Sequence, residues 1–367
     1  MDSKTYGFIG LGLIGGSIAR AIRLFSPESR IIAYTPHRET VDSAFAEKVI
    51  DTPLYEIGPD FGQCDYIFLC APVEVNNENL KALVPYLDPR TTVTDIGSVK
   101  TGIHDLVKEL GLTRQFIGGH PMAGTERIGF ANSKPGLLEN AYYIITKTED
   151  TEDDRLKDYE ELVRQMGALP LIIPYEQHDY ITAAISHVPH VISASLVNLV
   201  KDSDSEDQLM KTIAAGGFKD ITRISSSSPV MWNQICNTNS ANISELLGRY
   251  IDSLFDIKLA IDEHDEEKIL EFFSDARQYR ESFVDAAHGP LKTVYDIHID
   301  IDDKPGNLAR VAVLLSDNNI NIKNIGIVHN REYERGTLRI ELHDKQGLDK
   351  ARDILASNGY HYYSEQS

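Results

Sequence analysis

The 367-residue chain contains only three cysteines, and none of them lies in a CxxC pair. This spacing excludes a zinc ribbon and a disulfide framework, so buried free thiols are the simplest interpretation. The chain also lacks an uninterrupted apolar run of about 18 residues, which a membrane-spanning helix requires. Lysine and arginine total 36 against 56 aspartates and glutamates, and the resulting net charge of -20 argues against nucleic acid or an anionic membrane as a partner. We therefore expect a cytoplasmic protein that meets any anionic substrate with a local basic cluster.

Three blocks of different periodicity follow one another along the chain. From Tyr6 to about Pro174, seven β-rich runs alternate with helical ones, as in a doubly wound, mostly parallel α/β sheet. From Tyr175 to about His288 only helical periodicity is found, which predicts an all-α block. A linker is expected at "HGPLKT" (288–293), and the remaining residues predict β-α-β-β-α-β, the order of a ferredoxin-like α+β domain.

A glycine motif lies between the first predicted strand and the first predicted helix. Gly10, Gly12 and Gly15 form G-x-G-x-x-G. Gly10 would allow a tight turn, Gly12 the approach of the backbone to a pyrophosphate, and Gly15 close contact between helix and strand. The phosphates would lie at the helix N-terminus, next to Leu13 and Ile14. The motif therefore predicts a dinucleotide-binding Rossmann domain.

The end of the second predicted strand departs from the usual pattern of NAD-binding domains. Thr35 stands where an acidic residue commonly holds the adenosine 2'-hydroxyl, and His37 and Arg38 follow it. A hydroxyl and two potential cations leave both NAD+ and NADP+ open as cofactors, with Thr35 and Arg38 as candidate contacts. Alternatively, His37 and Arg38 are solvated loop residues.

Four further motifs occur in the order found in one enzyme family. They are "DIGSVK" (95–100), "GGHPMAGTE" (118–126), "ISHVPH" (185–190) and "AAGGFKDITRISSSSPVMWNQI" (214–235). Together they resemble the prephenate dehydrogenases of tyrosine biosynthesis. The resemblance implies oxidative decarboxylation of prephenate to 4-hydroxyphenylpyruvate, with hydride transfer to NAD+ (the family default) or NADP+ and no metal. An arogenate dehydrogenase is a close alternative, while a β-hydroxyacid dehydrogenase or a non-catalytic amino-acid sensor fits the motifs less well.

The C-terminal run "IDDKPGNLARV" (301–311) resembles the start of an ACT domain, a small regulatory module that binds amino acids. The resemblances imply a Rossmann domain over 1–174, an all-α substrate and dimerisation domain over 175–288, and an ACT-like regulatory domain over 293–367. They also imply a homodimer formed through the helical block.

His120 is the candidate proton acceptor. It follows a predicted strand, lies in a Gly/Pro loop at the expected carboxyl edge of the sheet, and carries an imidazole that titrates near neutral pH. Alternatively, it is a loop histidine held by backbone bonds. Ser98 would, by resemblance, orient His120 and the substrate hydroxyl. A serine in this place could instead cap the N-terminus of the following helix, and the two roles are compatible.

Arg223 matches the arginine that binds a substrate carboxylate in the family. A guanidinium pairs with a carboxylate through two hydrogen bonds, which is the physical reason for arginine there. The rival interpretation is a surface ion pair with Asp220. Lys219 adds positive charge next to Arg223, and Trp232, the only tryptophan, would pack near the site or in the core. Glu126 is placed near the site by resemblance alone.

Two histidines, His187 and His190, flank Pro189 in an apolar stretch. Pro189 cannot donate a backbone hydrogen bond to Ile185, so we expect a kink between the histidines. A zinc site would need at least one more ligand, and no CxxC or HExxH lies nearby. By resemblance, His190 contacts the substrate and His187 supports the pair of Ser98 and His120.

The regulatory site is expected in the turn between the first strand and helix of the last block. Backbone N–H groups at that helix N-terminus can bind an effector carboxylate, and by resemblance the effector is tyrosine. A domain that only dimerises by pairing of edge strands is the alternative. The candidate residues are Asp303, Pro305, Gly306, Asn307 and Leu308.

Overall fold

The computed structural model describes residues 3–124, 127–286, 295–302, 304–329 and 336–363. The chain forms two compact units, Met1–Phe255 and Asp256–Ser367. The linker expected over 288–293 lies outside the described residues, as do Glu126 and Asp303.

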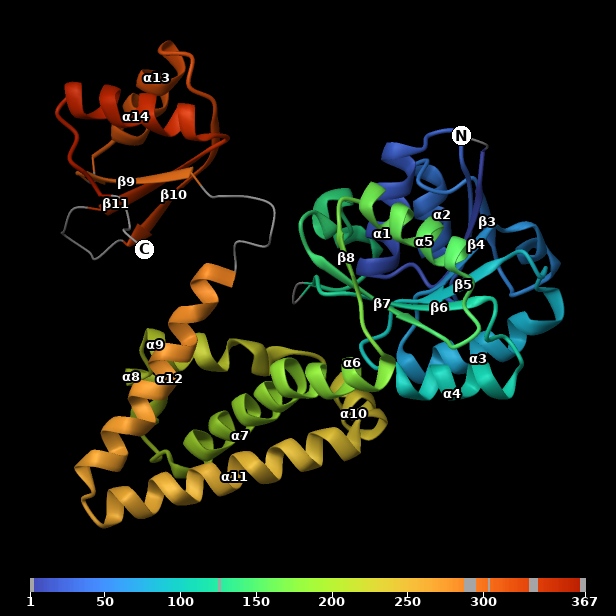
Figure 1. Ribbon diagram of the computed structural model, residues 1–367, viewed down its shortest axis with the longest axis horizontal. Helices are drawn as coiled ribbons and strands as arrows, with labels where there is room; N and C mark the ends of the chain where they lie inside the picture. The colour runs from blue at the N-terminus through green and yellow to red at the C-terminus, as the bar shows by residue number, and fades with distance from the viewer. Residues whose placement is uncertain (1–2, 125–126, 287–294, 303, 330–335, 364–367) are drawn as a thin grey trace. The chain divides into compact units, whose positions relative to one another are not determined.

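An eight-stranded sheet forms the centre of the first unit (Figure 1). Its strand order is β3-β2-β1-β4-β5-β6-β7-β8, and every neighbouring pair is parallel except β6 with β7. The predicted Rossmann-like, mostly parallel sheet is confirmed, although the three-residue strand β3 was not foreseen. The strands are β1 (Thr5–Ile9), β2 (Arg30–Tyr34), β3 (Thr52–Leu54), β4 (Tyr66–Leu69), β5 (Thr92–Asp95), β6 (Phe116–Pro121), β7 (Tyr142–Lys147) and β8 (Leu169–Ile172).

Helices cover both faces of this sheet, and the alternation of side chains along the strands supplies two cores. Phe8 and Phe68 pack with α1 (Leu13–Phe25), α2 (Arg38–Ala46) and α5 (Asp153–Gln165). The next residues, Ile9 and Leu69, pack on the opposite face with α3 (Val73–Leu83) and α4 (Thr101–Glu109). In Figure 1, α1 and α5 lie on one side of the sheet and α3 and α4 on the other.

The rest of the first unit is helical, which confirms the predicted all-α block. A π-helical turn, Ala183–His187, joins α6 to α7, and the Val188 N–H donates to the carbonyl of Ala183. The irregularity expected at Pro189 therefore takes the form of a widened turn just before the proline, which lacks an N–H. The helices are α6 (Tyr175–Thr182), α7 (Val188–Ser203), α8 (Leu209–Ile213), α9 (Gly216–Thr222), α10 (Pro229–Thr238) and α11 (Ser240–Asp262), the last of which continues into the second unit.

One helical run among the described residues, Tyr175–Ser203, is long and apolar enough to cross a membrane by length and composition alone. Buried helices of folded proteins pass the same test, so the match is weak. Three of the residues that it buries, His178, Asp179 and His187, are polar and hydrogen-bonded. Its exposed apolar residues include Ile185 and Leu199.

The second unit contains α12 (Glu266–Ala286) and a four-stranded antiparallel sheet of order β10-β11-β9-β12. Its elements follow the expected β-α-β-β-α-β order, and two helices share a core with the sheet. Gly306 caps α13 with a φ of 88, and the Asn307 side chain donates to the Asp302 carbonyl at 2.9 Å. Pro305 precedes this cap, and Leu308 is exposed. The elements are β9 (Tyr295–Ile301), α13 (Asn307–Asp317), β10 (Ile322–His329), β11 (Gly336–Leu342), α14 (Lys345–Ser357) and β12 (Tyr362–Tyr363).

His104 on α4 is buried where α4 meets α6. Its ring stacks on Tyr175 with centroids 4.3 Å apart, and its Nε2 shares a hydrogen bond with Thr146 Oγ1 at 2.8 Å. Burial, followed by the nearby charge of Lys100, lowers the pKa of His104 to about 3. The imidazole is therefore neutral in the folded protein at neutral pH.

We predict that acid destabilises the first unit through His104. Below the unfolded-state pKa of about 6.5, the unfolded chain binds a proton that the folded chain does not. Stability is therefore lost as pH falls, by about 1.4 kcal/mol per pH unit for each such histidine. His104→Gln should shallow the fall in the free energy of unfolding between pH 6.5 and 4.5, measured by urea denaturation. His37→Gln, at an exposed histidine, is the control. Equal slopes in wild type and His104→Gln would contradict the prediction.

Candidate active site

His120 lies within β6, paired opposite Ile144 of β7, and not in the loop expected from the sequence. The dipeptide His120-Pro121 ends the strand. The imidazole is partly buried. A strand residue has fixed φ and ψ, so this backbone holds the side chain more firmly than a loop would.

The imidazole of His120 is hydrogen-bonded to a second histidine that the sequence did not single out. His120 Nδ1 lies 2.8 Å from His178 Nε2, and His178 Nδ1 lies 2.7 Å from Asp179 Oδ1. His178 and Asp179, both on α6, are 0% and 1% exposed. The Rossmann sheet and the helical block thus meet at His120.

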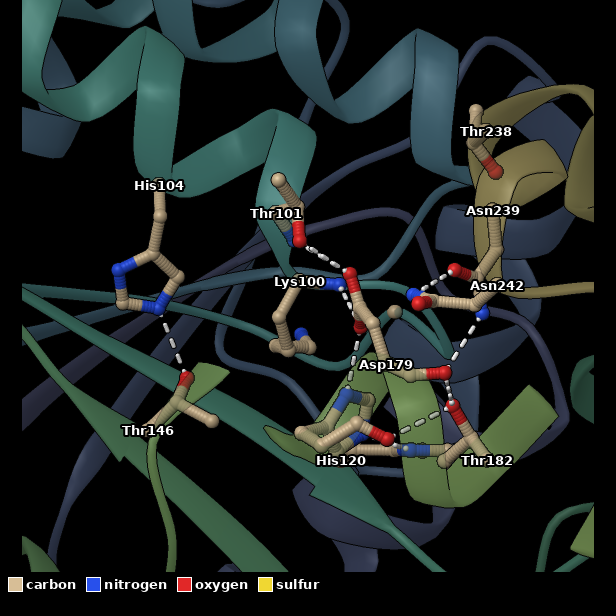
Figure 2. A network of polar contacts seen from close by, with 12 residues as sticks. Lys100, Thr101, His104, His120, Thr146, Asp179, Thr182, Thr238, Asn239 and Asn242 are labelled. Atoms are coloured by element: carbon tan, nitrogen blue, oxygen red, sulfur yellow. Dashed lines mark hydrogen bonds and ion pairs between the residues drawn. The ribbon is translucent and has the colours of Figure 1, made fainter. Parts of the chain in front are cut away.

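Asp179 also caps the N-terminus of α4. Its Oδ1 accepts from the backbone N–H of Lys100 at 2.8 Å, and its Oδ2 accepts from the backbone N–H of Thr101 at 2.8 Å and from the Thr101 hydroxyl at 2.6 Å. Figure 2 shows this carboxylate between α4 and α6. The capping role considered for Ser98 was therefore wrong, because α4 begins at Thr101 and a carboxylate distant in sequence supplies the cap.

Lys100 lies fully buried beside the same network. Its Nζ donates to the Asp95 carboxylate, at the end of β5, and to the Gly119 carbonyl at 2.7 Å. The second bond fixes the peptide that precedes His120. A buried lysine needs a carboxylate partner, and Asp95 provides it.

The pKa values of this cluster favour a neutral base. Burial, then the positive charge of His178, Lys100 and His187 when they are protonated, holds the pKa of His120 well below its usual range. Burial also lowers the pKa of His178, although Asp179 opposes this. For Asp179, burial raises the pKa, but hydrogen bonds from His178, Thr101 and Lys100 outweigh it and leave the pKa lowered.

The paired histidines of "SHVPH" contact other groups. His187 Nδ1 accepts from the Asn239 side-chain amide at 3.1 Å, so the residue bonded to His120 is His178 and not His187. His190 stacks on Trp232 with centroids 3.9 Å apart, and its Nδ1 donates to the Ser186 carbonyl at 2.8 Å. Among the described residues, no group of three or more histidines, cysteines or carboxylates is arranged to hold a metal ion.

Ser98 is half-buried, three residues beyond the end of β5. Within the described chain it makes no hydrogen bond, to His120 or to any other residue. Its hydroxyl is thus available to a ligand.

Lys219 and Arg223 lie on helical backbone and not in a loop. Lys219 is on α9, and Arg223 begins the 3₁₀ turn Arg223–Ser226. Both are exposed in the single chain, and among the residues that the structure describes no ion pair joins Arg223 to Asp220. The α9 segment is tied to α7, because the Ser193 hydroxyl donates to the Ile221 carbonyl at 3.1 Å.

The glycine loop has the geometry that the motif requires. Gly10 has a φ of +99, and an added Cβ would meet the Cys70 carbonyl carbon at 2.9 Å. A Cβ at Gly15 would meet the Cys70 Cβ at 2.8 Å, so the close contact between helix and strand needs glycine there. A Cβ at Gly12 would meet nothing within 4 Å and would project into open space at the start of α1. Leu13 and Ile14 begin α1, whose N-cap has no side-chain bond. These features fit a pyrophosphate at the helix N-terminus.

At the end of β2, Thr35 is buried and only 7% exposed. Arg38 begins α2, with its guanidinium carbon 4.6 Å from the centre of the Tyr55 ring. Tyr55 is held in turn by a hydrogen bond from its hydroxyl to Asp42 at 2.9 Å. The Arg38 side chain is thus stacked in place and is not simply solvated.

Four residues of this site escaped the sequence analysis: Asp95, Lys100, His178 and Asp179. Asp95 and Lys100 are the first and last residues of "DIGSVK", in which only Ser98 was predicted to act in the site. The adjacent pair His178-Asp179 carried a weak signal, because two titratable residues lie together within the first helix of the helical block.

Comparisons with known proteins identify the family. Residues 18–171 match the family described as prephenate dehydrogenase, nucleotide-binding domain, and residues 174–275 match prephenate dehydrogenase, dimerization domain. The prephenate dehydrogenase of Bacillus subtilis is 34% identical, over 94% of each chain. The chain belongs to the prephenate dehydrogenase family. A second prephenate dehydrogenase, from Lactococcus lactis, is also 34% identical, over 96% of this chain and 97% of its own.

Solved structures of this family have the same fold. The prephenate dehydrogenase of A. aeolicus, crystallised with hydroxyphenyl propionate and NAD+, matches with a TM-score of 0.73 and 31% identity, over 77% of this chain and 99% of that one. The arogenate dehydrogenase of Synechocystis matches with a TM-score of 0.69 and 27% identity, over 76% of this chain and 99% of that one. The predicted function, an NAD-dependent prephenate dehydrogenase, is thus supported by sequence and by fold.

Two alanine substitutions in the glycine loop should separate folding from cofactor binding. Gly10→Ala forces a side chain into a backbone contact at positive φ, so we expect a loss of roughly 1–3 kcal/mol of stability. Gly12→Ala meets no protein atom, so the melting temperature should stay near that of wild type while NADH affinity falls at least roughly tenfold. Thermal unfolding without cofactor and fluorescence titration with NADH measure the two effects. Unchanged NADH binding in Gly12→Ala would refute this placement of the pyrophosphate.

Proposed function

We propose that this chain converts prephenate to 4-hydroxyphenylpyruvate, with His120 as the proton acceptor. The observation that carries the proposal is the imidazole of His120 at the end of β6, which is partly accessible and is fixed by its hydrogen bond to the buried His178. The next strand, β5, ends beside Ser98, and the glycine loop follows β1. In an open α/β sheet the carboxyl ends of such strands form the usual ligand site.

In this reaction the C4 hydroxyl loses its proton as C4 gives up a hydride and the C1 carboxylate leaves as CO2. NAD+, when bound at the glycine loop, supplies the hydride acceptor. His120 takes the hydroxyl proton, because its lowered pKa keeps the imidazole neutral and ready to accept. Ser98, whose hydroxyl is available, would orient that hydroxyl. Aromatisation of the ring drives the decarboxylation forward.

The substrate carboxylates require positive or donor groups. Arg223 is proposed to bind one carboxylate through two hydrogen bonds, with Lys219 adding positive charge. The buried Trp232 Nε1 has no hydrogen-bond partner within the described residues, so its N–H is available to a ligand oxygen. His190, stacked on Trp232, would add a further contact with the substrate.

Arogenate is the second candidate substrate, because a solved relative with this fold is an arogenate dehydrogenase. Arogenate carries an amino group in place of the keto group of prephenate. NAD+ is the proposed cofactor, and NADP+ stays open because Arg38 is stacked beside the expected adenosine site. Parallel assays with both substrates and both cofactors, followed by nicotinamide absorbance, decide among these pairs. No reduction with either substrate would refute the proposed function.

Homodimerisation, regulation and location complete the proposal. The helical block matches a dimerization domain, and it exposes apolar side chains such as Leu199, Ile213 and Ile251 in the single chain. We propose that a second copy covers such residues. The C-terminal sheet is proposed to be an ACT domain that binds tyrosine near Gly306 and Asn307, and the enzyme is proposed to be cytoplasmic.

His120→Asn should lower kcat by roughly 10²- to 10⁴-fold, the range for loss of a positioned general base. Asparagine can keep a hydrogen bond to His178 but cannot accept the proton. Steady-state kinetics with saturating cofactor measure the effect, and an unchanged circular dichroism spectrum controls for folding. Wild-type turnover would remove His120 from the mechanism.

Arg223→Ala should raise KM for prephenate by at least roughly tenfold, with a smaller effect on kcat. The interaction of Arg223 with a substrate carboxylate is present in the ground state as well as in the transition state, so its loss affects mainly KM. Arg223→Lys keeps the charge but loses the geometry for two parallel hydrogen bonds, so its KM for prephenate should lie between the values of wild type and Arg223→Ala. Lys201→Ala, at an exposed lysine of the same helical block, serves as the control and should leave KM unchanged. A KM that stays constant in Arg223→Ala would contradict the assignment.

A further inference from the structure

The two hydrogen bonds that link His120, His178 and Asp179 fix the position of every proton among them. An ionised carboxylate can only accept, so His178 Nδ1 must donate to Asp179 Oδ1. Because burial lowers the pKa of His178, its ring is neutral and its Nε2 carries a lone pair. Across the 2.8 Å contact, His120 Nδ1 must therefore donate to His178 Nε2. The remaining nitrogen of His120, Nε2, is then the unprotonated one.

We propose that His178, fixed by Asp179, is a positioning residue that holds His120 in the tautomer whose Nε2 accepts the substrate proton. The proposal rests on the proposed function, since it explains how His120 is kept ready for that proton. An aspartate performs a comparable task for histidine in the serine-protease triad, where loss of the correct tautomer is costly. Here a second histidine lies between the aspartate and the base.

Asp179 is suited to this task because its charge is fixed. Its two oxygens accept three hydrogen bonds besides the one from His178: two from the backbone N–H groups of Lys100 and Thr101 and one from the Thr101 hydroxyl. The positive end of the α4 dipole adds to their effect. These contacts keep the carboxylate ionised and prevent it from rotating. Asp179 therefore orients His178 without competing for its proton.

The environment of His120 also accounts for the fate of the transferred proton. The substrate O–H bond breaks and an N–H bond forms at His120 Nε2, so His120 becomes an imidazolium. Its Nδ1–H bond to His178 then becomes charge-assisted and stronger. The proton leaves His120 to solvent after the product departs, and no further reactant is needed.

A purely structural role for His178 makes a different prediction. It would hold α6 against β6, and its loss would lower stability without changing the protonation of His120. Asp179→Asn cannot separate the two roles, because an amide nitrogen cannot accept from the N–H groups of α4. Substitutions at His178 leave that cap intact.

Two variants of His178 test the proposal. His178→Leu removes the acceptor for His120 Nδ1–H, and we expect kcat to fall roughly 10²-fold while KM changes less than about threefold. His178→Gln can present its Oε1 to the same N–H, so kcat should recover to within about tenfold of wild type. Thr182→Val is the matched control, because Thr182 is buried on the same helix and, among the described residues, its hydroxyl bonds only to the carbonyls of His178 and Asp179. Its kcat should stay at the wild-type value.

Nitrogen-15 spectra of protein labelled in its histidine rings report the tautomer directly. In wild type we expect His120 to be protonated at Nδ1 and not at Nε2, and in His178→Leu this preference should be lost. The pH profile is a second readout. Burial lowers the pKa of His120, and so does positive charge on Lys100 and, when it is protonated, on His187. Neutral His178, fixed by Asp179, accepts from His120 Nδ1–H and stabilises the imidazolium. Replacing His178 with leucine should therefore lower the pKa of His120 further and move the acid limb of kcat to lower pH.

The proposal is overturned if His178→Leu folds with wild-type kcat, or if His120 keeps its protonated Nδ1 in that variant. It is also overturned if His178→Gln and His178→Leu are equally impaired in kcat with unaltered spectra. Failure of the proposed function is distinguishable, because the wild-type protein would then reduce no nicotinamide with either substrate, and failure of His120 as the base would show as normal turnover in His120→Asn, whatever the His178 variants do.

Discussion

The site depends on the hydrogen bonds that the carboxylate of Asp179 accepts from α4 and from His178. Asp179 lies on α6, caps α4 of the Rossmann domain and orients the histidine that is bonded to His120. Burying a carboxylate is costly unless hydrogen bonds compensate for the lost water, and backbone N–H groups at a helix N-terminus provide such bonds to Asp179. Docking of the helical block on the sheet therefore assembles the base. The sheet contributes His120 and the helical block contributes His178 and Asp179, so neither part alone contains the hydrogen-bonded chain of three residues.

The parts of the fold that the sequence predicts are those governed by short-range rules. The glycine loop is recognisable from the spacing of its glycines within six residues, although the atoms that exclude a Cβ at Gly10 and Gly15 belong mainly to Cys70, which follows β4. Strands and helices of the sheet follow from local alternation, apart from β3, which is only three residues long. His120 was found through its motif, although its placement in a loop was wrong because β6 extends through Pro121.

The partners of His120 could not be predicted in this way, because the contacts join residues far apart in the chain. His178 is 58 positions from His120, and Asp179 is 79 positions from Lys100. No periodicity specifies which helix face docks on which strand end. The more prominent histidine pair in "SHVPH" drew the assignment to His187, which is buried one helical segment further along. The capping role of Ser98 failed for the same reason, since a carboxylate from another element replaced a local serine.

The charges around His120 suit both states of a proton acceptor. Two carboxylates, Asp95 and Asp179, and one ammonium, Lys100, are buried within one hydrogen-bonded network. The cluster carries a net negative charge while His120 is neutral, and it becomes neutral when His120 accepts a proton. Burial opposes protonation in the resting enzyme, whereas the excess negative charge limits the energy of the imidazolium once it forms. A second lysine in this place would remove that balance, and the loss of Lys100 would leave Asp95 buried without a cationic partner, with only the Gly97 N–H donating to it among the described residues. The ion pair between Lys100 and Asp95 therefore helps to set how readily His120 accepts a proton.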